Sequence, residues 1–160
     1  IGGLGLAFQT GEWVMKVSLK LACVALALCA SVLPASAQRI ASPGQTVYFF
    51  SGTTADPLNP NIPAGQPGRM GNTVQQVDSI LNKLQAMLEK NNLTFADVIK
   101  ATVFLVADPA NGNKMDFAGL NGEWAKRFPT DKPRPSRSAF QIVELPLPGA
   151  LAEVELIAAK

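Results

Sequence analysis

The chain has no histidine, and its only two cysteines, Cys23 and Cys29, both lie near its beginning. Without an imidazole, the protein cannot form a serine or cysteine nucleophile activated by a histidine base, nor a zinc or haem site with histidine ligands. The later part of the chain must also hold its core without disulfides. Any catalysis therefore depends on carboxylates, arginine, lysine, hydroxyls or backbone groups.

Charge of either sign is also scarce. Fourteen basic and 12 acidic residues among 160 give a formal net charge of +2, and the one local excess of positive charge lies between Lys126 and Arg137. A strong nucleic-acid surface needs clustered lysine and arginine and a marked positive balance. We therefore expect no nucleic-acid partner.

An apolar segment near the beginning has the pattern of an export signal. Two lysines follow closely on Met15, an unbroken apolar stretch runs over Leu21–Ala30, and small residues end the segment at Ala37. This order of basic, apolar and small residues is the one that signal peptidase reads. It predicts a signal peptide over residues 15–37, cleaved after Ala37, and a periplasmic or secreted mature protein that has no membrane anchor.

A membrane-anchored helix is the alternative for this segment. A spanning helix needs about 20 apolar residues, whereas Ser31 and Pro34 interrupt the stretch, so the signal peptide is favoured. Residues 1–14 precede the first candidate initiator and are interpreted as upstream sequence or an artefactual extension. Residues 38–160 are then expected to form a single domain.

Periodicity divides this domain into four strands and two helices. Strands are expected at Thr46–Ser51, Val98–Val106, Ser136–Glu144 and Ala152–Ala158, and helices from Thr73 to about Asn91 and from Met115 to Arg127. Thr73 is expected to cap the first helix, with Gln76 completing a capping box. A long proline-rich and glycine-rich loop, Thr53–Gly71, precedes this helix. The order of elements implies an α+β domain with two helices on one face of a mixed sheet.

Two residue types stand out as candidates for chemistry. Arg137 opens a strand directly after a proline-rich loop, where a guanidinium could grip a carboxylate through two parallel hydrogen bonds. Residue type alone favours an ordinary solvated arginine. Glu153 and Glu155 share one face of the last strand, a pattern that on its own is typical of a half-solvated strand.

A third group of polar residues superficially resembles a calcium loop. Asp108, Asn111, Asn113 and Asp116 lack the alternate spacing and the final glutamate that an EF-hand needs. They are therefore interpreted as a polar turn that caps the second helix, and the sequence predicts no metal site.

Four separated stretches agree in order and spacing with one known family, and the agreement extends from about Val47 to the end of the chain. They are Asp97–Leu105, Gly119–Trp124, Pro135–Ser138 and Gly149–Ala158. On these residues the chain resembles the RidA/YjgF/UK114 family. Residues 108–119 are also similar to an exported bacterial branch of that family. The family's Gly-Pro-Tyr-Ser stretch has no counterpart here, because residues 39–44 replace it.

The resemblance implies a chorismate-mutase-like (YjgF-like) α+β fold, assembled as a homotrimer with three clefts between subunits. It also implies hydrolysis of reactive enamines and imines to 2-keto acids and ammonia, with no metal and no organic cofactor. The implied partner is therefore a small imino or keto acid. The alternative is a non-catalytic trimer that binds a carboxylate or keto acid in the cell envelope.

The resemblance also implies roles for individual residues. Arg137 matches the arginine that holds the substrate carboxylate, and Glu153 matches the glutamate that orients or activates water. Ser51 and Gly52 match the end of an early strand whose backbone lines the pocket. Asn121 matches a helix asparagine near that pocket.

Overall fold

The computed structural model describes residues 38–160. The expected signal peptide and the residues before it lie outside the described part of the chain. The helices and strands follow in the order β1 (Val47–Thr54), α2 (Thr73–Lys90), the short 3-10 helix η1 (Phe95–Asp97), β2 (Val98–Val106), the 3-10 helix η2 (Pro109–Asn111), α3 (Phe117–Arg127), β3 (Ser136–Ile142) and β4 (Ala152–Ala159).

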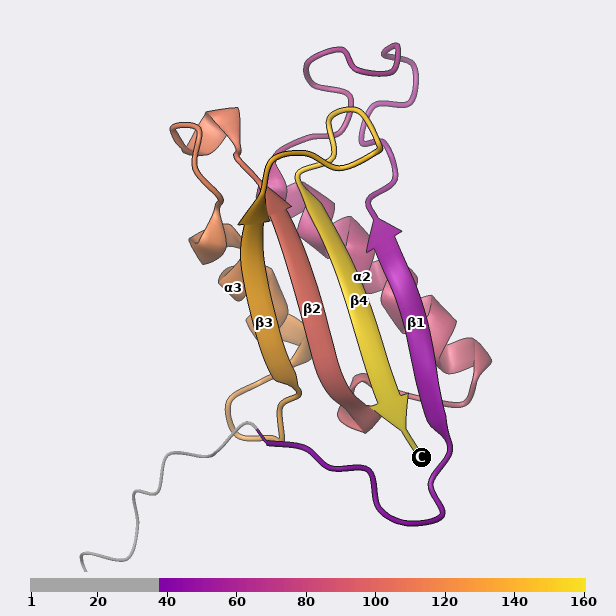
Figure 1. Ribbon diagram of the computed structural model, residues 1–160. Coiled ribbons are helices and arrows are strands. Elements are labelled where there is room, and N and C mark those ends of the chain that lie inside the picture. The colour runs from indigo at the N-terminus through magenta and orange to yellow at the C-terminus, as the bar shows by residue number, and fades with distance from the viewer. Residues whose placement is uncertain (1–37) are drawn as a thin grey trace, which may run out of the picture. The chain divides into compact units, whose positions relative to one another are not determined.

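The four strands form one mixed sheet in the order β1-β4-β2-β3 (Figure 1). β4 pairs antiparallel with both β1 and β2, while β2 and β3 are parallel and are joined through α3. A parallel pair needs such a crossover, because a tight turn can join only antiparallel strands. Both helices cover the same face of the sheet, so the expected α+β fold with two helices on one face is confirmed.

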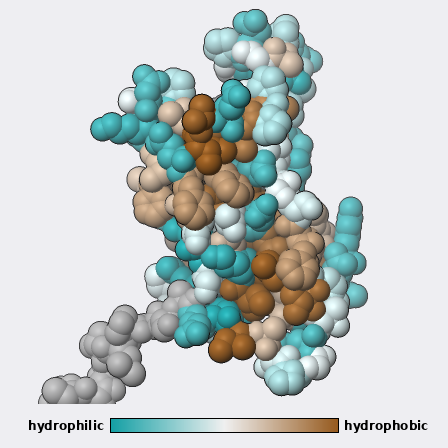
Figure 2. Space-filling view, viewed as in Figure 1, coloured by the Kyte–Doolittle hydropathy of each residue, from teal (hydrophilic) through white to brown (hydrophobic). Residues whose placement is uncertain are grey.

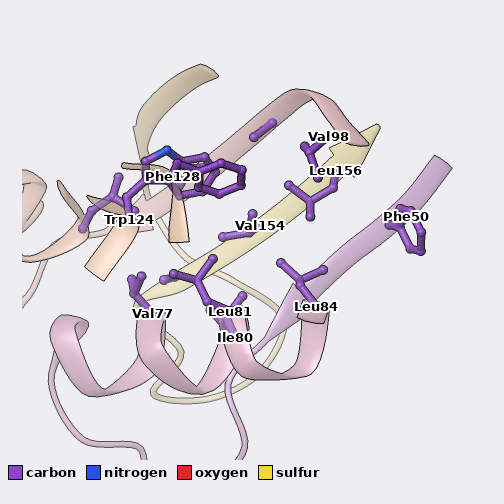
Figure 3. Packing of buried hydrophobic residues seen from close by; sticks show 14 of the residues in the cluster. Phe50, Val77, Ile80, Leu81, Leu84, Val98, Trp124, Phe128, Val154 and Leu156 are labelled. Atoms are coloured by element: carbon purple, nitrogen blue, oxygen red, sulfur yellow. The ribbon is translucent and has the colours of Figure 1, made fainter. Parts of the chain in front are cut away.

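The hydrophobic core fills the space between α2 and the covered face of the sheet. Apolar residues three and four positions apart place one continuous stripe along α2. The stripe packs against alternate residues of the central strands (Figure 3). The buried residues that meet here include Val77, Ile80, Leu81, Leu84 and Leu88 of the helix, and Val98, Val103, Leu105, Val154 and Leu156 of the strands.

The cap of α2 differs from the expected one by one residue. The assignment of Thr73 as cap with Gln76 was wrong, because the Asn72 and Gln75 side chains form the capping box. Thr73 is buried instead, and its hydroxyl and backbone N–H donate to one oxygen of Asp108 at 2.7 and 3.0 Å. This hydrogen bond to a distant residue holds Thr73 inside the helix, and a local capping pattern does not reveal such a partner.

Strand β1 runs further than the sequence pattern indicated. The strand was expected to end before Gly52, but it continues to Thr54. A β-bulge between Phe50 and Thr53 takes up an extra residue and restores pairing with β4 beyond it. Bulges of this kind redirect side chains and are common next to active sites.

The start of α3 and the end of β3 also lie inside the expected limits. Asp116 caps α3, so the helix begins after it rather than at Met115. The backbone N–H of Met115 donates instead to the Gln141 side chain at 3.0 Å. β3 ends at Ile142 rather than at Glu144. The neighbouring chain segments, rather than local propensity, set these boundaries.

The loop between β1 and α2 is anchored by a buried amide. The Gln76 side chain donates to the carbonyl oxygens of Gly71 and Gly149 at 3.1 and 3.0 Å and accepts from the backbone N–H of Leu151 at 2.8 Å. It therefore joins the end of this loop to the segment that enters β4. Over residues 38–160, no helix has the length and apolar character to cross a membrane.

Candidate active site

Arg137 lies near the start of β3, and its side chain belongs to the face of the sheet that the helices cover. It is paired with Ala101 of the parallel strand β2, and Ala101 is buried in the core. Directly opposite residues in a sheet point to the same face. The guanidinium is therefore directed toward α3, and not toward the open face.

Residues of α3 surround this guanidinium. Its Nη2 donates to the Asn121 side-chain oxygen at 2.5 Å, and its central carbon lies 4.8 Å from the centre of the Trp124 ring and 5.7 Å from that of Phe117. Its Nη1 is buried and has no hydrogen-bond partner among residues 38–160. A buried, unpaired N–H costs roughly 1–3 kcal/mol.

A cavity of about 390 Å³ lies beside the guanidinium. Its lining consists of Asn121, Trp124, Ala125, Arg134, Pro135 and Arg137. None of these described residues is acidic, so the cavity carries two positive charges and no negative one. Burial, and then the positive charge of Arg134, lowers the pKa of Arg137. A guanidinium nevertheless remains charged at neutral pH. The cavity is therefore suited to a small anion.

Glu153 lies on the other face of the sheet. In β4 it alternates with residues buried in the core, and it is paired with Thr54 of β1 and Phe104 of β2. Its carboxylate lies against Gly52 in the β1 bulge, so closely that a Cβ added at Gly52 would overlap it. Gly52 therefore has a steric reason to be glycine, since it leaves the space that the carboxylate fills.

The open face of the sheet carries exposed apolar side chains. Phe49 and Phe140 are 77% and 52% exposed, and hydrophobic residues gather over this face in Figure 2. Ser51 lines a separate hollow of about 240 Å³ there, together with Lys100 and Glu155. Contiguous exposed apolar patches are one signature of interaction surfaces in proteins.

The residues singled out from the sequence thus fall into two groups. The structure brings Arg137 and Asn121 together on the helix-covered face. It brings Ser51 and Gly52 to the bulge on β1, with Glu153 beside Gly52. One chain does not place Arg137 and Glu153 in the same cavity, because their side chains leave opposite faces of the sheet.

Three residues near the Arg137 guanidinium or its cavity were not among the candidate site residues chosen from the sequence. Phe117 lies against the guanidinium, and Trp124 and Arg134 line the cavity. Their roles depend on how β3 packs against α3. An aromatic residue three positions after Asn121 is the one signal that a helical spacing could have supplied.

The polar turn after β2 serves the fold. Asp108 accepts hydrogen bonds from Thr73 and from the backbone N–H of Ala110, and Asp116 caps α3. The turn therefore caps the second helix, as expected, and also holds the start of α2. Among the described residues, no group of three or more acidic or cysteine side chains is placed to hold a metal ion.

The fold and the arginine cavity define a small α+β domain with a site suited to anions. The sequence pattern of the Endoribonuclease L-PSP family matches residues 37–160, and the chain belongs to this family. A RutC family protein of Haemophilus influenzae is 33% identical over 109 residues, which cover 65% of this chain and 73% of that protein. The chloroplastic Reactive Intermediate Deaminase A of Arabidopsis thaliana is 36% identical over 83 residues, but the match covers 52% of this chain and only 40% of that protein.

Solved structures agree on the fold. A YjgF/YER057c/UK114 family member from Mycobacterium tuberculosis has a TM-score of 0.53 at 22% identity, covering 76% of this chain and 82% of its own. A Rid family protein from Yersinia pestis has a TM-score of 0.57 at 20% identity, covering 82% and 94%. At these identities the likeness establishes the fold alone.

Proposed function

We propose that the protein hydrolyses reactive enamines and imines of amino acids to 2-keto acids and ammonia. The observation that carries this proposal is the Arg137 guanidinium, which is fixed by Asn121, lies over Trp124 and lines a cavity that contains no acidic side chain among the described residues. The similarity to the Arabidopsis protein, which is named a reactive intermediate deaminase, supports the same reaction.

The reaction requires positioning more than a strong nucleophile. Arg137 binds the substrate carboxylate and thereby fixes the adjacent C=N group. The enamine gains a proton at carbon to become the imine, and the protonated imine is already electrophilic. Water adds to its carbon, the C–N bond then breaks, and ammonia leaves as the 2-keto acid forms. Glu153 is assigned to hold this water and accept its proton.

The two groups of residues meet only if copies of the chain assemble. We assign the open, aromatic face of the sheet to contacts between copies, so that Arg137 of one copy faces Glu153 of another across a cleft. A homotrimer with three such clefts fits the position of the two groups on opposite faces. Cyclic closure of this kind repeats one contact around an axis.

A second candidate function is binding without turnover. The separation of Arg137 from Glu153 within one chain favours it, because the arginine cavity alone can hold a carboxylate or a keto acid. In that case Arg137→Ala abolishes ligand binding and Glu153→Ala leaves it intact, with no ammonia released by either variant or by the wild type.

The deciding experiment is imine hydrolysis by the purified protein. An amino-acid oxidase generates imines in situ, and the loss of imine and release of ammonia are followed above the spontaneous rate. The proposal requires acceleration by the wild type, a large loss in Arg137→Ala, and a loss of turnover with retained keto-acid binding in Glu153→Ala. Equal rates with wild type and Arg137→Ala would remove the assigned site.

The pattern of residues 15–37 leads us to place this activity in the periplasm or outside the cell. Mass spectrometry of the protein recovered from periplasmic and culture fractions tests the placement. A mature chain that begins at Gln38 supports it, and a chain in the cytoplasm that still contains residues 15–37 contradicts it.

A further inference from the structure

The arginine cavity contains a second guanidinium for which the proposed mechanism has no use. Arg134 lines the same 390 Å³ space as Arg137 and stands three residues before it. Binding of a single substrate carboxylate by Arg137 leaves the charge of Arg134 without a function in the cavity.

The surroundings of Arg134 do not neutralise it. Its Nε donates to the carbonyl oxygen of Pro129 at 3.3 Å, an interaction that leaves the two terminal nitrogens for other partners. Across residues 38–160, no salt bridge involves Arg134 or Arg137. The three ion pairs in this part of the chain use other cations, among them Arg127, which contacts Asp78.

The charges of Arg134 and Arg137 also favour binding of an anion between them. Two like charges that line one cavity repel each other. Burial is the larger cause of the lowered pKa of Arg137, and the positive charge of Arg134 adds to it. An anion between them removes the repulsion, and charge-assisted hydrogen bonds to guanidinium groups are about twice as strong as neutral ones. The cavity volume also lies within the roughly 300–1,000 Å³ range of small-molecule sites.

We infer that Arg134 is a specificity-determining residue, and that the site takes dicarboxylic 2-imino acids, with one carboxylate on Arg137 and the second on Arg134. This inference rests on the proposed function for the reaction, but it makes its own statement about the ligand. The substrates are then the imines of acidic amino acids rather than those with small apolar side chains.

Two keto acids with the same five-carbon chain test the inference by binding. 2-Oxoglutarate carries a terminal carboxylate that 2-oxopentanoate lacks, and isothermal titration gives the Kd of each. The expected preference of the wild type for 2-oxoglutarate is about tenfold or more. Arg134→Ala should lose this preference while binding 2-oxopentanoate within about threefold of wild type, because Arg137 is untouched.

Two further variants separate a specific contact from charge and from fold. Arg134→Lys keeps the charge and should retain part of the preference. Lys132→Ala removes a nearby charge from the same loop, but Lys132 lines a different cavity, so this control should keep the preference. Equal Kd values for the two keto acids in the wild type, or an equal loss for both in Arg134→Ala, would overturn the inference.

Turnover is measured in parallel on imines generated in situ from glutamate and from norvaline, which yield the same two keto acids. A binding preference without turnover of either imine refutes the proposed reaction and leaves the assignment of Arg134 standing. Turnover of both imines with equal kcat/KM and equal keto-acid Kd values supports the reaction and refutes the assignment. Failure to bind or convert either compound refutes both.

Discussion

Replacing Arg137 by alanine removes the group on which substrate binding depends in this account. The variant loses the charge-assisted hydrogen bonds to the substrate carboxylate, and truncating one partner of a desolvated charge pair costs roughly 2–5 kcal/mol. Since about 1.36 kcal/mol corresponds to a factor of ten in rate, we expect kcat/KM for imine hydrolysis to fall by at least about 30-fold. The loss should be in binding, so the Kd for a keto acid should rise in parallel.

The fold should tolerate this change. Arg137 is only half-buried, and its Nη1 is an unpaired buried donor within the described residues, so its removal relieves a cost as well as freeing the Asn121 side chain. We expect the free energy of unfolding to change by no more than about 1 kcal/mol, measured by urea denaturation. Unchanged kcat/KM in a folded Arg137→Ala protein would refute the assignment of the carboxylate to this residue.

The remaining predictions concern the bulge and two buried polar groups. Gly52→Ala should displace the Glu153 carboxylate and lower kcat in the hydrolysis assay. The unfolding midpoint should stay near wild type, because only the end of a flexible side chain must move. An unchanged kcat would contradict the role of Glu153. Gln76→Leu should lower the free energy of unfolding, measured by urea denaturation, by about 2–4 kcal/mol. The substitution leaves the buried N–H of Leu151 and two carbonyl oxygens without their partner. A stability equal to wild type would show that this amide is dispensable. Burial opposes ionisation of Asp108, but hydrogen bonds from Thr73 and Ala110 outweigh it and lower the pKa below the ordinary 3.8. The ionised Asp108 therefore stabilises the fold fully above pH 3.8, and this stabilisation is lost as the pH falls through the pKa of the folded state. The difference in unfolding free energy between wild type and Asp108→Asn should shrink below pH 3.8. A difference that does not change with pH would contradict this role of Asp108.

The elements of the fold could be predicted from the sequence because their signals are local. The apolar stripe of α2 and the alternation in β4 appear at the expected residues, and β2 has the expected limits, Val98–Val106. The errors arose where a distant residue decides the outcome. Asp108 draws Thr73 into a buried hydrogen bond, which moves the helix cap to Asn72.

The site could be predicted only in part, for the same reason. The resemblance named Arg137 and Asn121 separately as site residues, and the structure joins the two side chains by a hydrogen bond. Glu153 lies on the opposite face because it is paired with Phe104 of β2, whereas Arg137 is paired with Ala101 of the same strand. Local patterns do not determine these pairings. The second cation, Arg134, lies in the proline-rich loop between α3 and β3. Local sequence patterns do not determine the direction of this loop.

The central claim is that a working site takes its arginine from one copy and its glutamate from another. Arg137→Ala and Glu153→Ala are each expected to be inactive alone, and co-expression of the two in equal amounts, with different affinity tags for tandem purification, yields mixed assemblies. In every trimer that carries both tags, one of the three clefts combines an intact Arg137 with an intact Glu153, so about a third of the clefts are complete. The mixed assemblies are predicted to recover about this fraction of the wild-type activity. Mixed assemblies as inactive as either parent would contradict the account.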